Sequence, residues 1–329
     1  MIRVGLFLWV LLISLDTKAQ VQALDLELQN FPYPYPVAYL PLNVQKQALR
    51  MAYMDVSPSR SNGKTVLLLH GKNFSGAYWD STVAVLSQNG FRVIVPDQIG
   101  FGRSSKPANF QYSFHLLAQN TKTLLDSLGV EKVSVLGHSM GGMLATRFVL
   151  MFPGRVEKLI LENPIGLEDY KTLAPYQTVD AGYQNELKQD YEKIKAYQRQ
   201  NYYGGEWKPQ YDRWVAMLAG WTRNPDYPVI AWNAALTSEM IYTQPVVYEF
   251  EKITVPTLLI IGQRDRTAIG KNLVSEEMRK TMGQYPELGK KTQQRIKNST
   301  LVELDNVGHL PHIEKFDAFI KPLLQFLQK

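Results

Sequence analysis

A serine lies in this sequence where a short strand turns directly into a helix, in the stretch GHSMG at residues 137–141. Val133, Val135 and Leu136 are typical of a buried strand, and apolar residues continue at helical spacing to residue 150. Glycines on both sides of Ser139 remove the Cβ atoms that would collide in so tight a turn. The pattern predicts a nucleophilic serine, and an incidental serine in a glycine-rich loop is the alternative.

A serine hydroxyl reacts when an imidazole takes its proton and a carboxylate orients that imidazole. Asp265 follows an apolar run at residues 257–262, and His309 follows another at residues 300–304. The order along the chain is Ser, Asp, His, and parallel strands end at one edge of a sheet, so the three side chains can converge there. We predict Ser139 as the nucleophile, His309 as the base and Asp265 as the acid that orients it.

The tetrahedral intermediate of such a reaction needs hydrogen-bond donors for its oxyanion. The amide of Met140 begins a helix, lacks an intrahelical acceptor and lies at the positive end of the helix dipole. The loop HGKNFSG at residues 70–76 follows the apolar run at residues 65–69, so the Lys72 amide is predicted as the second donor. The Lys72 side chain points either to solvent or to the substrate.

Other residues compete for the acid and base roles. His312 lies on the approach to the last predicted helix, whereas His309 directly follows a strand and is therefore preferred as the base. Glu168 and Asp169 are alternatives for the acid. In the structural alternative, Asp265 forms only a surface ion pair with Arg266, its neighbour.

Metal ligands are sparse in the sequence. The two histidines at positions 309 and 312 form an H-x-x-H pair, but no third ligand follows at a recognisable spacing, and the chain has no cysteine. We therefore expect no metal site, no disulfide and no cofactor.

Asp97 is expected to have a structural role, pairing with Arg103 or capping backbone amides.

The elements that position these residues alternate between apolar strands and amphipathic helices from residue 65 to residue 161. This alternation predicts an α/β fold with a mostly parallel central sheet and helices on both faces. Residues 47–56 are predicted to be an edge strand, and the proline-rich stretch before them an extended surface segment. From residue 164 to residue 254 helical patterns rich in tyrosine and tryptophan predict a helical cap, whose rings also suit a pocket for apolar or aromatic groups.

Composition indicates a globular protein of 329 residues with 45% apolar and 20% charged residues. The net charge of +6 comes without a dense basic run interleaved with aromatics, so nucleic acid is not expected as a partner. The stretch MIRVGLFLWVLLISLDTKAQ predicts a signal peptide cut at Ala19 or Ala23 and a periplasmic or secreted protein. Its apolar run is too short for a comfortable membrane span, so no stable anchor is expected after removal, and a retained anchor is the alternative.

Several of these motifs together resemble the α/β-hydrolase superfamily. They are His70-Gly71, the loop at residues 96–104, the GHSMG turn, Gly262-x-x-Asp265 and Gly308-His309. The helical insertion is similar to the capped branch that holds epoxide hydrolases, haloalkane dehalogenases, carbon-carbon bond hydrolases and many esterases. The first two use an aspartate where this chain has Ser139, so the resemblance implies acyl transfer. The oxyanion loop lacks the proline or extra glycines that many relatives carry.

The sequence patterns and the resemblance together predict a division into a signal peptide at residues 1–19, an N-terminal extension with the edge strand at 20–63, a hydrolase core at 64–164 and 255–329, and a helical cap at 165–254. The implied function is a serine hydrolase that cleaves carboxylic esters of small apolar or aromatic molecules through an acyl-enzyme. Carbon-carbon bond, lactone or amide hydrolysis with the same triad is the alternative within enzymes. A binding protein that has lost turnover is the alternative outside them.

Overall fold

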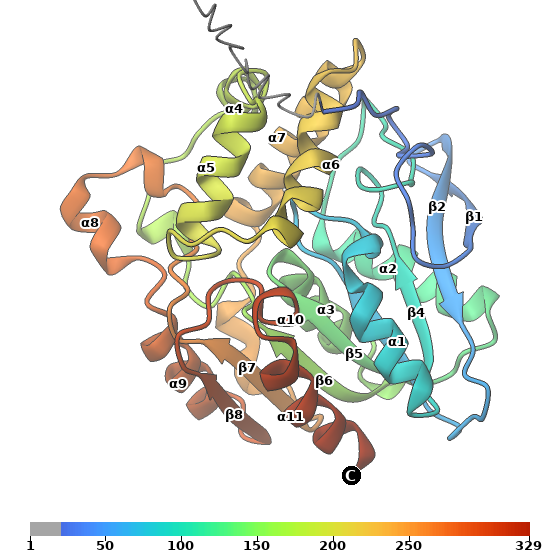
Figure 1. Ribbon diagram of the computed structural model, residues 1–329. Coiled ribbons are helices and arrows are strands. Elements are labelled where there is room, and N and C mark those ends of the chain that lie inside the picture. Colours follow the sequence, from blue (N-terminus) through green and yellow to red (C-terminus); the bar gives the residue numbers. More distant parts are fainter. Residues whose placement is uncertain (1–20) are drawn as a thin grey trace, which may run out of the picture.

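The computed structural model describes residues 21–329, and the predicted signal peptide at residues 1–19 lies outside the described part. Eight strands form one sheet in the order β1-β2-β4-β3-β5-β6-β7-β8 (Figure 1). The strands are β1 (Val37–Val44), β2 (Gln47–Val56), β3 (Thr65–Leu69), β4 (Arg92–Pro96), β5 (Val133–His138), β6 (Val156–Glu162), β7 (Thr257–Gly262) and β8 (Ser299–Leu304).

Pairing is antiparallel between β1 and β2 and between β2 and β4, and parallel between all other neighbours. The α-helices are α1 (Asp80–Gln88), α2 (Phe114–Ser127), α3 (Met140–Met151), α4 (Val179–Glu186), α5 (Tyr191–Asn201), α6 (Asp212–Thr222), α7 (Tyr227–Thr243), α8 (Glu276–Thr281), α9 (Tyr285–Arg295), α10 (Pro311–Glu314) and α11 (Phe316–Gln328). The predicted α/β class, with a mostly parallel sheet and helices on both faces, is confirmed.

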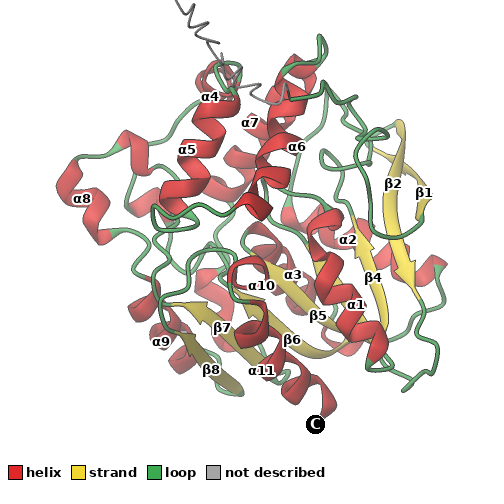
Figure 2. Cartoon of the chain, viewed as in Figure 1, coloured by secondary structure: helices red, strands yellow, loops and turns green. Residues whose placement is uncertain are grey.

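Helices cover both faces of the sheet because successive residues of each buried strand point to opposite sides (Figure 2). In β3, Val66 and Leu68 join the core that includes residues of α1 and α11, whereas Leu67 and Leu69 join the core that includes residues of α2 and α3. A strand buried on both faces is apolar at nearly every position, and β3 is apolar and buried from Val66 to Leu69. The sheet therefore forms a rigid base for the loops at its carboxyl edge.

The prediction for the sheet edge was wrong. β2, expected as the edge strand, lies between β1 and β4, and the edge is β1. The proline-rich stretch thus contributes a strand where only an extended surface segment was predicted. Pro41 is tolerated within β1 because an edge strand leaves one row of backbone groups without a strand partner.

Helices α4 to α7 lie between β6 and β7 in the sequence and form a separate layer at the top of Figure 1. A helical pattern at residues 186–200 predicts one helix there, but α4 ends at Glu186 and the second helix, α5, begins only at Tyr191. The Asp190 carboxylate caps the second helix by accepting from Lys193 N at 2.8 Å. The insertion is therefore built from short, individually capped helices.

Candidate active site

Ser139 lies in the turn between β5 and α3 with φ 55° and ψ −121°, a conformation that L-residues rarely adopt. The chain passes so closely here that a Cβ at Gly137 would lie 2.1 Å from the oxygen of Gly141. A Cβ at Gly141 would lie 2.2 Å from the oxygen of Leu69 on β3. Both glycines are therefore required by space, and the turn presents the serine hydroxyl at the carboxyl edge of the sheet.

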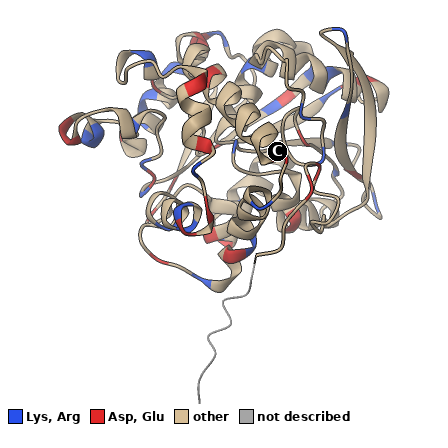
Figure 3. Cartoon of the chain, turned by 90° about the horizontal axis from the view of Figure 1, so that it is seen from above, with Lys and Arg blue, Asp and Glu red and all other residues tan. Residues whose placement is uncertain are grey.

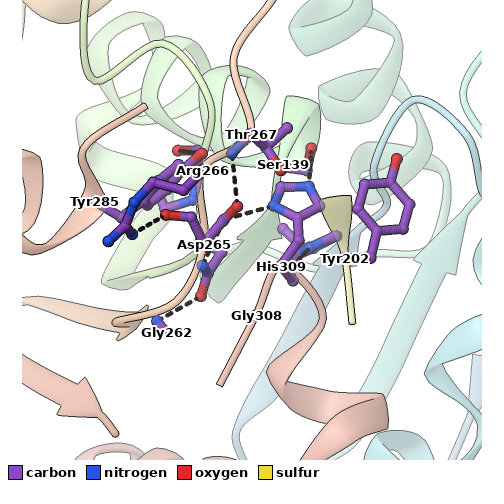
Figure 4. A network of polar contacts seen from close by, with 12 residues as sticks. Ser139, Tyr202, Gly262, Asp265, Arg266, Thr267, Tyr285, Gly308 and His309 are labelled. Carbon is purple, nitrogen blue, oxygen red and sulfur yellow. Dashed lines mark hydrogen bonds and ion pairs between the residues drawn. The ribbon is translucent and has the colours of Figure 1, made fainter. Parts of the chain in front are cut away.

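The structure brings Ser139, His309 and Asp265 into one hydrogen-bonded chain (Figure 4). His309 Nε2 lies 3.0 Å from Ser139 Oγ, and His309 Nδ1 lies 2.7 Å from Asp265 Oδ2. The three residues follow β5, β8 and β7 respectively. A carboxylate on Nδ1 leaves Nε2 free to take a proton from the serine, which is the geometry that nucleophilic catalysis requires.

The Asp265 carboxylate is fully buried but well supplied with donors. Besides His309, it accepts from Asn163 Nδ2 at 2.7 Å and from Thr267 N at 2.8 Å. Burial by itself acts to raise the pKa of Asp265, but the charge of His309 and the hydrogen bonds from His309, Asn163 and Thr267 bring that pKa below its ordinary value. The acid is therefore ionised at neutral pH.

Asn163 is a site residue that the sequence reasoning missed. It directly follows β6, with φ 36°, and its Oδ1 accepts from Gly262 N at 2.9 Å while its Nδ2 donates to Asp265. Asparagine is among the residues that best tolerate positive φ. Its position in the sequence was the available signal. Asn163 directly follows the buried strand β6, and parallel strands end at the same edge of the sheet, so it lies at the edge where Asp265 follows β7.

His138 connects two loops of the site. Its Nε2 lies 2.7 Å from the carbonyl oxygen of His309, so Nε2 carries the proton and donates it. Its Nδ1 accepts from the hydroxyl of Tyr78, which in turn accepts from Gly71 N. Burial and the neighbouring histidines hold the pKa of His138 well below its ordinary value, so the ring stays neutral. This chain ties the loop after β3 to the loop of His309.

His312 points away from the serine and into the protein. Its Nδ1 and backbone N both donate to Glu162 Oε1, at 2.8 and 2.9 Å, and its ring stacks on Trp79. Both members of this pair are buried. Of the two histidines that the sequence placed near the base position, His309 alone bonds to Ser139.

The other residues weighed for the acid role lie in separate hydrogen bonds. Glu168 accepts from Gly283 N, and Asp169 accepts from Lys171 N and from the Tyr248 hydroxyl. Neither of these carboxylates is bonded to His309, whose Nδ1 is occupied by Asp265.

Asp97 and Arg266, the other two residues with an expected structural role, form hydrogen bonds outside the Ser139–His309–Asp265 chain. Asp97 accepts from the backbone N–H groups of Gly76 and Arg103 and from the Tyr33 hydroxyl, which confirms a structural role. Arg266 donates to the backbone oxygens of Gln263 and Asp265. Its guanidinium therefore does not compete with His309 for the Asp265 carboxylate.

The loop after β3 lies against the nucleophile. A Cβ at Gly71 would lie 3.1 Å from side-chain atoms of both His138 and Ser139, so the next residue, Lys72, is held close to the serine. Within residues 21–329 the amides of Lys72 and Met140 donate to no other backbone or side-chain acceptor. The Lys72 ammonium lies 3.4 Å from Glu186 at the end of α4. The amides of the two predicted oxyanion donors are thus unpaired in the described part of the chain, and their role stays a prediction.

A pocket of about 40 Å³ opens over Ser139 and His309. Apolar and aromatic side chains of both the sheet loops and the insertion line it, together with polar residues of the loop after β3: Lys72, Asn73, Phe74, Ile165, Tyr197, Tyr202, Ile241, Thr267 and Ile269. A cavity of about 150 Å³ accommodates benzene, so this pocket admits only a few heavy atoms.

Among residues 21–329 no group of three or more histidine, aspartate or glutamate side chains is arranged to hold a metal ion. In the same part of the chain no helix has the length and apolarity needed to cross a bilayer. Figure 3 shows lysine, arginine and acidic residues distributed over the view. Two of the basic residues of α9, Lys290 and Lys291, are exposed.

Comparison with known proteins gives consistent matches. The family model of the α/β hydrolase fold matches residues 64–316. A crystal structure of a protein named as a probable hydrolytic enzyme from Pseudomonas aeruginosa is 50% identical, with a TM-score of 0.93 over 94% of this chain and 100% of that chain. An esterase from Exiguobacterium antarcticum shares the fold at 20% identity, with a TM-score of 0.67 over 86% of this chain and 97% of that chain.

Some curated sequence relatives match over a smaller part of the chain. An uncharacterized protein of Mycobacterium tuberculosis is 39% identical over 106 residues, which is 32% of this chain. The match spans only 30% of that relative's length. The family model covers well over half of the chain and includes the serine turn, the acid and the histidine. The chain therefore belongs to the α/β hydrolase fold family.

Proposed function

We propose that this hydrolase cleaves carboxylic esters through a covalent acyl-enzyme on Ser139. The observation that carries the proposal is the continuous chain from Asp265 through His309 to the serine oxygen, with bonds of 2.7 and 3.0 Å. The strained turn at Ser139 and the free amides beside it support the same reaction.

In the proposed reaction Ser139 Oγ attacks the ester carbonyl carbon while His309 Nε2 takes the hydroxyl proton. The resulting oxyanion accepts hydrogen bonds from the amides of Lys72 and Met140. The intermediate then collapses, the carbon-oxygen bond to the alcohol breaks, and His309 returns the proton to the leaving oxygen. A water molecule, deprotonated by His309, attacks the acyl carbon and releases the acid and the free serine.

The pocket supports a small apolar substrate. Isoleucine side chains from three separate segments, Ile165, Ile241 and Ile269, form part of its wall, and Phe74 adds an aromatic face. The β-branched side chains have few rotamers with which to make room. A short acyl group fits a space of about 40 Å³, whereas an aromatic group requires the insertion to move.

The nucleophile is tested by replacing Ser139 with alanine. We expect covalent labelling by a fluorophosphonate probe to disappear and thermal unfolding to change little, because the variant keeps every glycine of the turn. Labelling measured by mass spectrometry, with unfolding followed in parallel, checks both. Labelling that persists in Ser139→Ala would refute the assignment.

The reaction class is tested by a side-by-side panel of nitrophenyl esters, lactones, amides and vinylogous diketones, with Ser139→Ala as the control. Esters should be cleaved faster than the other classes by orders of magnitude. Among esters, acetyl should exceed octanoyl and benzoyl. If a lactone or diketone is cleaved faster than every ester, the protein belongs to one of the alternative hydrolase classes. A burst of acyl-enzyme before the steady state would exclude the alternative of a binding protein without turnover.

A further inference from the structure

Tyr202 lies in the helical insertion, between α5 and the short 3-10 helix at Pro209–Tyr211, yet it contacts the predicted base. Figure 4 shows its ring beside the imidazole of His309. The two ring centroids are 5.0 Å apart and the planes are inclined by 27°, which is a stacked arrangement. The insertion therefore supplies a direct neighbour of the histidine as well as a wall for the pocket.

The backbone of Tyr202 is bonded to the same loop. Its carbonyl oxygen accepts from His309 N at 3.2 Å. A Cβ at Gly308 would lie 1.9 Å from that oxygen, so the approach depends on the glycine before the histidine. His309 is thus held from its backbone and from one ring face by a single residue of the insertion.

The hydroxyl of Tyr202 reaches the opposite side of the site. It accepts from Asn73 Nδ2 at 3.0 Å, and Asn73 directly follows Lys72, whose amide is the proposed oxyanion donor. One side chain therefore spans the distance between the base and the oxyanion loop.

We propose that Tyr202 is a positioning residue that holds the His309 base and the oxyanion loop in register with each other. The inference rests on the proposed function and adds a residue from the insertion to it. The ring face is placed to stabilise the imidazolium that forms when His309 takes the serine proton. The hydroxyl, through Asn73, keeps the Lys72 amide at its distance from the serine.

These two effects are separable by substitution. Tyr202→Phe keeps the ring and the carbonyl but removes the bond to Asn73, so the fluorophosphonate labelling rate should fall about fivefold, the effect of one neutral hydrogen bond, with an unchanged pH profile. Asn73→Leu should produce the same loss, and the double variant should lose no more than either single one. Additive losses would show that the hydroxyl and the amide act separately and would overturn this link.

Tyr202→Leu removes the ring as well. On acidification the labelling rate should then fall at a pH roughly half a unit lower than in the wild type, because the imidazolium loses a stabilising ring face. With a short nitrophenyl ester, kcat should fall more than KM changes. A rise in KM alone would identify Tyr202 as a substrate wall and overturn the proposal.

Tyr203 supplies matched controls in the same segment. Its ring is buried against Tyr211 at 3.7 Å, and its hydroxyl has no hydrogen-bond partner within residues 21–329. Tyr203→Phe and Tyr203→Leu should leave the pH profile unchanged. If the Tyr202 variants behave like the Tyr203 variants, Tyr202 only packs the insertion and the inference is wrong. A wild-type protein that the probe does not label would overturn the proposed function itself.

Discussion

Asn163 shows how much of the site depends on one side chain outside the triad. It donates to Asp265 and accepts from Gly262 N, so it joins the end of β6 to the loop after β7. Its φ of 36° is a backbone conformation that costs asparagine less free energy than it costs alanine. The acid of the site is thus positioned by its neighbour strand and not by its own loop alone.

Asn163→Ala should destabilise the protein by about 2–3 kcal/mol, because a hydrogen bond to a charged group is lost and the buried N–H of Gly262 is left without its partner. Urea unfolding measures the change, and the fluorophosphonate labelling rate should fall with it. Asn163→Asp is the informative companion, since it tolerates positive φ but sets a second carboxyl against Asp265. Its stability should recover as the pH falls and one carboxyl takes a proton. Equal stability of Asn163→Ala and wild type would contradict this account.

At the scale of the elements, the turn from β5 into α3 leaves no space for a side chain at Gly137 or Gly141. The helix begins at Met140, immediately after the serine, and its first turn passes over the ends of β3 and β5. Such close passage presents the serine hydroxyl beside the first free amides of the helix. The geometry of the nucleophile is therefore a property of a strand, a helix and two glycines together.

Gly141→Ala should cost roughly 1–3 kcal/mol and slow labelling strongly, because the new Cβ must push the helix away from β3. Gly154→Ala is the control, since a Cβ there meets nothing within 4 Å and its backbone is not in the positive-φ region. That variant should be neutral or slightly more stable. Thermal unfolding of both variants checks the pair, and an equally stable Gly141→Ala protein would show that the turn has room.

At the level of the whole molecule, the sheet order brings residues from distant parts of the sequence to one edge. The loops after β3, β5, β6, β7 and β8 all contribute, and the insertion at α4 to α7 covers them. The charge of His309 and the hydrogen bonds that the buried Asp265 accepts in this assembly link folding to pH. Its pKa in the folded state is depressed, so its contribution to stability is present above the unfolded value near 3.8 and is lost as the pH falls through the folded value.

The difference in the free energy of unfolding between wild type and Asp265→Asn should therefore shrink as the pH is lowered from about 6 to about 3. Urea unfolding at several pH values measures this difference, in which the contributions of groups that do not interact with Asp265 cancel between the two proteins. A difference that stays constant or grows toward low pH would show that the folded state does not favour the ionised carboxylate.

Much of this architecture was predictable because its signals are local. The continuous apolar runs at β3 and β7 and the glycines around Ser139 indicate their own elements within a few residues. The edge strand was misassigned because the prolines of the N-terminal stretch indicated only an extended chain. Whether such a segment pairs, and with which strand, is decided by a partner elsewhere in the sequence.

The sequence by itself determined the types of the elements, the serine turn and the order of the three candidate residues, since periodicity and turn chemistry act between near neighbours. Only the tertiary structure decided that Asn163 holds Asp265, that His312 is buried against Glu162, and that Tyr202 of the insertion lies on His309. These contacts join residues roughly a hundred or more positions apart. Their geometry depends on how strands pair and where the insertion packs, which no local pattern encodes.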